Sequence, residues 1–97
     1  MDDVHLGRAF TFLSKAMREM CTNTDDLRTR WTKATESHLG GSWVGHFPDG
    51  LKHRFSELEP SLGQIPKSEE GAEILIERLV SLHDDVELAF YEQRPGA

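Results

Sequence analysis

The side chains that could bind a metal in this 97-residue chain are its histidines and their acidic neighbours. His38, His46 and His53 lie near one another in the sequence, with Asp49 between the last two, and zinc takes imidazole and carboxylate ligands. No two of these histidines have the i, i+4 spacing that places both ligands on one face of a helix. We therefore expect no bound metal and no cofactor.

The candidate nucleophiles lack the neighbours that catalysis needs. Ser42 is not part of a Gly-x-Ser-x-Gly turn, and Cys21 falls inside an expected helix, where we expect an inert packed thiol. The acidic pairs 25–26, 69–70 and 84–85 are sequence neighbours, which do not face each other on a helix. The sequence therefore predicts a protein that is not an enzyme.

Charge and hydropathy exclude two classes of partner. The chain has 17 acidic and 11 basic residues and a formal net charge of −6, which disfavours nucleic acid and anionic membrane surfaces. Its apolar runs are too short for membrane insertion, and the N-terminus lacks the pattern of a signal peptide. We expect one domain in the cytoplasm, or secretion by a route that needs no signal peptide.

A heptad pattern dominates the first part of the chain, where no proline occurs between residues 3 and 39. Residues recur in alternating steps of four and three at Leu6, Phe10, Leu13, Met17, Met20, Thr24, Leu27, Trp31, Ala34 and His38. This spacing predicts one helix over about 3–39. Gly40 and Gly41 then predict a turn over 40–48.

The same rhythm resumes after the turn, but prolines interrupt it. The second set of positions is Leu51, Phe55, Leu58, Leu62, Ile65, Glu69, Ala72, Ile76, Leu79, His83, Val86 and Phe90. Pro60 and Pro66 lie within this set, and proline in a helix interior costs about 3 kcal/mol. We expect a second helix at about 49–59, a break at 60–67 and a third helix at about 68–92, capped by Ser68.

His38 and His83 share these heptad positions with apolar residues. We expect partly buried, hydrogen-bonded rings there. The alternative is a pH-sensitive contact between helices.

Additional apolar residues widen the predicted contact face. Ala9 and Ala16 flank the first stripe, and Leu75, Leu82 and Ala89 flank the second. A face this wide is typical of a four-helix bundle. The sequence predicts an all-α antiparallel hairpin with a proline-broken second arm, which pairs with itself or a similar chain. The alternative is a compact three-helix bundle.

The expected turn contains the spacing Leu39, Trp43, Gly45. Here the chain resembles the WXG family, small helical-hairpin proteins of bacterial type VII secretion systems, in which this motif lies between the two arms. The C-terminal Tyr-x-x-x-Asp/Glu of that family is absent, since Tyr91 is followed at that spacing by Pro95. The resemblance implies a partner or substrate of such a system, in contact with secretion-system components.

Two functional hypotheses follow. The first is a WXG-like module that binds through helix pairing, with Leu39, Trp43, Gly45, Leu75, Leu82 and Ala89 as binding residues. The second is a cytosolic inhibitor, immunity protein or adaptor that binds its target through an acidic helical face.

Overall fold

The computed structural model describes residues 3–22, 24–39 and 44–92, and this part of the chain is mostly helical, without strands. Its helices are α1 (Asp3–Thr22), α2 (Leu27–Leu39), α3 (Lys52–Leu58) and α4 (Glu69–Glu92). Short 3-10 turns lie at Val44–His46, Asp49–Leu51 and Glu59–Ser61. The predicted all-α bundle is confirmed.

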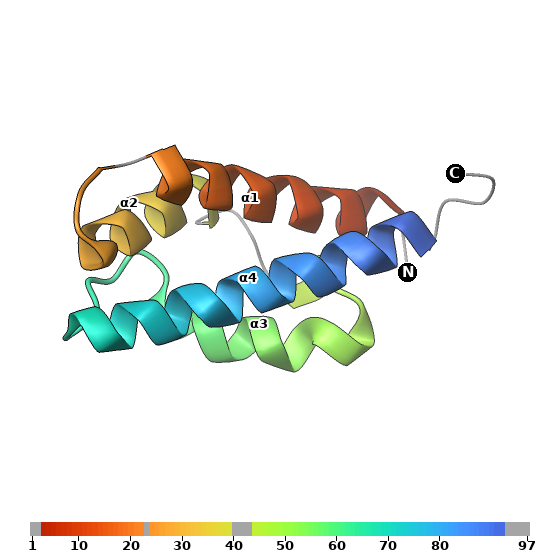
Figure 1. Ribbon diagram of the computed structural model, residues 1–97. Coiled ribbons are helices and arrows are strands. Elements are labelled where there is room, and N and C mark those ends of the chain that lie inside the picture. The colour runs from red at the N-terminus through yellow and green to blue at the C-terminus, as the bar shows by residue number, and fades with distance from the viewer. Residues whose placement is uncertain (1–2, 23, 40–43, 93–97) are drawn as a thin grey trace.

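The two long helices, α1 and α4, cross the whole molecule in opposite directions (Figure 1). The shorter α2 packs beside α1, and α3 packs against α4 (Figure 1). The radius of gyration is 13.2 Å. A compact domain of 100 residues has a radius of gyration of about 13 Å, so a single chain has the size of a compact domain.

The predicted helix over 3–39 is divided in the structure. Helix α1 ends at Thr22, whose hydroxyl donates back to the Arg18 carbonyl at 3.0 Å. Helix α2 starts after Asp26, whose carboxylate accepts a 2.8 Å hydrogen bond from the Thr29 amide. This is N-cap geometry, and the bond lowers the pKa of Asp26 below its ordinary value. Local side-chain hydrogen bonds therefore divide the predicted helix, because short polar side chains compete with the helical backbone for hydrogen bonds.

The second part of the chain lies close to its predicted boundaries. The break falls between Ser61 and Glu69, where Gly63 has a φ of 72° that suits glycine. Ser68 caps α4, since its hydroxyl accepts a 3.0 Å bond from the Gly71 amide. An ion pair between Arg54 and Asp85 links α3 to α4.

The core is built from all four helices. Trp31, Phe47 and Phe55 are fully buried, and the two phenylalanine rings stack with their centroids 4.4 Å apart. The flanking rows are covered inside the same chain. Ala9, Ala16 and Leu82 are fully buried, and Leu75 and Ala89 pack against the core. The width of the apolar face therefore does not require a second chain, which was the reason for expecting one.

Candidate functional site

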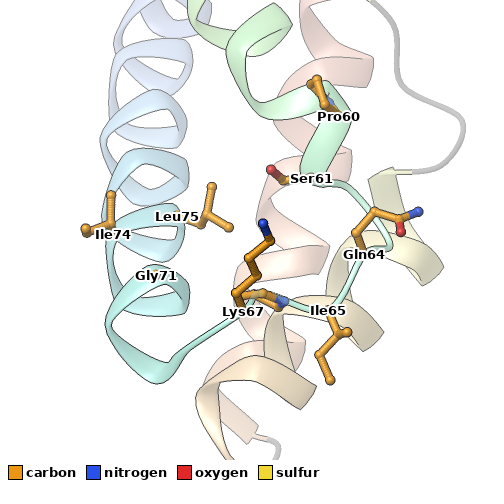
Figure 2. A pocket seen from close by; sticks show the side chains of 9 residues that line it. Pro60, Ser61, Gln64, Ile65, Lys67, Gly71, Ile74 and Leu75 are labelled. Atoms are coloured by element: carbon orange, nitrogen blue, oxygen red, sulfur yellow. The ribbon is translucent and has the colours of Figure 1, made fainter.

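An open apolar groove lies between the segment 60–67 and the first half of α4 (Figure 2). Its volume is about 360 Å³. It is lined by Pro60, Ser61, Gln64, Ile65, Pro66, Lys67, Gly71, Ile74 and Leu75. Ile65 on one wall is 61% exposed, and Ile74 on the other is 50% exposed. The groove therefore exposes two isoleucines to water, which makes it the candidate site.

Side chains of α2 hold the wall formed by the segment 60–67. The Trp31 indole N–H donates to the Ser61 carbonyl at 2.8 Å, and Arg28 Nε donates to the Pro66 carbonyl at 2.7 Å. Trp31 is fully buried, so the donor of this part-buried hydrogen bond is shielded from water. These two bonds attach the wall at both ends.

A third hydrogen bond fixes the middle of this wall. The Gly63 amide donates to the Thr35 hydroxyl at 2.8 Å, and this buried hydroxyl donates to the Trp31 carbonyl at 2.7 Å. The Thr32 hydroxyl lies 3.3 Å from the Gln64 carbonyl but only 2.9 Å from the Arg28 carbonyl, so its proton mainly serves its own helix. The wall is therefore ordered before any partner arrives.

The opposite wall is the first half of α4. Leu75 packs against the core, whereas Ile74 turns outward beside it (Figure 2). The exposed carboxylates of Glu70, Glu73 and Glu77 lie within one helical turn of Ile74. Lys67 lies on the loop wall across the groove, and its side chain extends toward the space between the two walls (Figure 2). The groove is thus apolar inside, acidic along one edge and basic on the other wall.

Charge is also segregated between the exposed faces of α1 and α4. The exposed acidic residues of α4 are Glu69, Glu70, Glu73, Glu77, Asp84 and Glu92, against one exposed basic residue, Arg78. The exposed positions of α1 whose side chains the structure describes are Arg8, Thr11, Lys15, Arg18, Cys21 and Thr22. The two long helices therefore present solvent faces of opposite sign.

The binding residues predicted from the sequence do not form one surface. Leu39 and Leu82 are fully buried, and Ala89 packs against the core. Gly45 lies in the 3-10 turn at 44–46, and Trp43 lies outside the described residues.

Only Leu75 among the predicted residues lines the groove. Ile74 was not among the predicted binding residues, although a signal was present: it is an isoleucine outside both apolar rows of its helix, with glutamates at 70, 73 and 77. Ile65 was predicted as a heptad position within the expected break, and it is exposed on the loop.

The histidines near the turn do not gather. His46 is buried beside the Phe12 ring, His53 is exposed, and His38 Nε2 lies 3.4 Å from a Glu19 carboxylate oxygen. Within the described residues, no three His, Cys, Asp or Glu side chains are placed to hold a metal ion. Cys21 is exposed near the end of α1, so the expectation of a packed thiol was wrong.

One chain of polar contacts has the order found in serine hydrolases. Ser14 Oγ lies 3.1 Å from His83 Nε2, and His83 Nδ1 lies 3.4 Å from an Asp84 carboxylate oxygen. The second contact is long, and the Asp84 side chain is 68% exposed, so it orients the ring weakly. Ser14 lies mid-helix, where backbone N–H groups are already bonded along the helix and cannot stabilise an oxyanion. The arrangement provides hydrogen-bond partners for the mostly buried His83 ring, as expected at its heptad position.

Comparison with protein-family models, with curated proteins and with solved structures finds no match. Among the described residues, no helix is both long enough and apolar enough to cross a membrane.

Proposed function

We propose that this chain is a non-enzymatic protein-interaction module and that the groove between the segment 60–67 and α4 is its binding site. The observation that carries the proposal is the exposure of Ile65 and Ile74 on two walls that are already fixed. Flexible surface residues can fold back onto a core, but these two are held apart by the backbone that bears them.

The energetics favour an apolar side chain of a partner in the groove. Covering the exposed part of each isoleucine contributes roughly 1 kcal/mol by the usual area relation. Because Trp31, Arg28 and Thr35 hold the loop beforehand, little ordering cost opposes binding. An interface of small area at this groove can therefore bind a partner protein.

The acidic edge supports the adaptor or inhibitor form of this proposal. Glu70, Glu73 and Glu77 project their charge beside Ile74, and a charged surface of this kind accelerates encounters with a complementary partner. Exposed ion pairs contribute little affinity, so the apolar groove supplies the binding energy and the charges select the partner.

The type VII secretion hypothesis remains a separate proposal that rests on sequence pattern. Its residues Leu39 and Gly45 lie outside the groove, and the observed bundle has four helices in one chain where the resemblance implied a two-arm hairpin. The proposed binding site in the groove does not depend on this hypothesis.

Photo-cross-linking in cells of the source organism tests the binding site. A photoreactive amino acid replaces Ile74 in one variant and Leu88 in the control, because Leu88 lies on the same helix and is 59% exposed. The two positions are 14 residues apart, about 21 Å along the helix. We expect a discrete adduct from position 74 and none from position 88. Equal labelling from both positions, or none from either, contradicts the proposed site.

A further inference from the structure

We propose that the groove binds a second copy of this chain, so that two chains pair about a two-fold axis through their grooves. This inference rests on the proposed function, because it names the partner of the same site. Apart from Ile65 and Leu75, the residues of the groove lie outside the helix-pairing stripes predicted from the sequence, most of which the chain buries within itself.

The shape of the groove region is self-complementary. A two-fold interface brings the same surface of both copies together, so that surface must carry both the protruding group and the hollow that receives it. Ile65 and Ile74 protrude, and the groove of about 360 Å³ lies between them. Each copy can therefore offer an isoleucine to the hollow of the other.

The charges around the groove are self-complementary as well. Lys67 stands on the loop wall, and Glu70 and Glu77 flank Ile74 on the helix wall. Across the parts of the chain that the structure describes, none of these three side chains forms an ion pair. A two-fold rotation about an axis that runs along the groove places each Lys67 opposite the carboxylates of the other copy. These pairs set the alignment, while the isoleucines supply the affinity.

The long solvent faces do not suit such pairing. Two copies that met through α1 would bring together Arg8, Lys15 and Arg18 of both chains, and two that met through the outer face of α4 would oppose rows of carboxylates. Like charges across an interface are repulsive. The groove is where exposed apolar side chains adjoin charges of both signs.

Light scattering of the purified chain over a range of micromolar concentrations tests the pairing. We expect the mass to rise toward that of a dimer as concentration increases. Ile74→Gln should remain monomeric, whereas Leu88→Gln, a change of the same kind on the same helix, should pair as the unchanged chain does. Both positions are exposed, and circular dichroism verifies that the variants keep their helices.

A charge exchange tests the alignment. Lys67→Glu makes the groove surface wholly acidic. Glu70→Lys with Glu77→Lys leaves Glu73 as the acidic residue beside Ile74 and makes the surface mainly basic, so neither variant should pair with itself. Mixed together, they restore both contacts and should form a heterodimer. Self-pairing of either variant at the unchanged affinity overturns the two-fold alignment.

The outcomes separate this inference from the proposed function. A chain that stays monomeric at every concentration overturns self-pairing. An adduct from position 74 at twice the chain's mass supports it, whereas an adduct with a different protein keeps the proposed function and overturns the second copy as partner. A dimer that Ile74→Gln leaves intact places the interface elsewhere and overturns the inference.

Discussion

The indole N–H of Trp31 donates a 2.8 Å hydrogen bond to the backbone carbonyl of Ser61, thirty residues further along the chain. The contact joins the centre of α2 to the start of the loop that forms one groove wall. A buried tryptophan thus serves both the core and the binding surface. The candidate site is consequently tied to the stability of the bundle, and its predictions can be tested by unfolding as well as by binding.

Trp31→Phe should lower the free energy of unfolding by about 1 to 3 kcal/mol. The ring still fills most of the core space, but the Ser61 carbonyl loses its partner, and unpaired buried polar groups cost about this much. Urea unfolding followed by circular dichroism measures the change. An unchanged midpoint would mean that water replaces the indole without cost and that this bond does not hold the wall.

Thr35→Val should destabilise the chain by about 1 to 3 kcal/mol for the same reason, since the Gly63 amide then has no hydroxyl to donate to. The matched control is Thr11→Val, because Thr11 is exposed on α1 and its substitution should change stability by at most about 0.5 kcal/mol. Equal effects of the two substitutions would count against the role assigned to Thr35.

Amide hydrogen exchange tests the same contact without altering the core. The Gly63 amide, bonded to buried Thr35, should exchange more slowly than that of Gly50, a glycine in an exposed turn. In Thr35→Val the difference should largely disappear. Fast exchange at Gly63 in the unchanged chain would show that the loop opens freely and would remove the argument for a preformed groove.

Asp26→Ala should lower the stability of α2 at neutral pH, because the cap to the Thr29 amide is lost. That hydrogen bond holds the pKa of Asp26 below its ordinary value of 3.8. The stabilising effect is therefore fully present above that value and is lost as the pH falls through the lower, folded-state pKa. The difference between the two proteins in thermal unfolding should shrink below pH 3.8. A difference that stays constant into stronger acid would contradict the assigned cap.

The heptad pattern predicted the core well because burial follows periodicity. Leu6, Leu13, Leu79 and Val86 are buried where the stripes place them. The end of α1 at Thr22 and the start of α2 at Leu27 could not be predicted from periodicity. The stripe continues through Thr24 and Leu27, whereas the hydrogen bonds of Thr22 and Asp26 end one helix and begin the next.

The groove was harder to predict because the loop that forms one wall has no periodic pattern of apolar residues. Its position depends on hydrogen bonds between side chains of α2 and backbone atoms 28 to 38 residues away, and backbone donors and acceptors leave no mark in a sequence. Ile65 has the heptad spacing but is exposed, because the helical segment ends with the 3-10 turn at Glu59–Ser61. Ile74, an apolar residue outside both rows of α4, was the one readable signal.

The most direct test of the central claim is the amide NMR spectrum of the labelled chain with its partner bound. The partner is either unlabelled chain or, where cross-linking captures another protein, that protein. The account predicts shift changes at residues 61–67 and 71–75 and none along the exposed face of α1 between Arg8 and Arg18. Changes confined to that face of α1, with the groove unaltered, would contradict it.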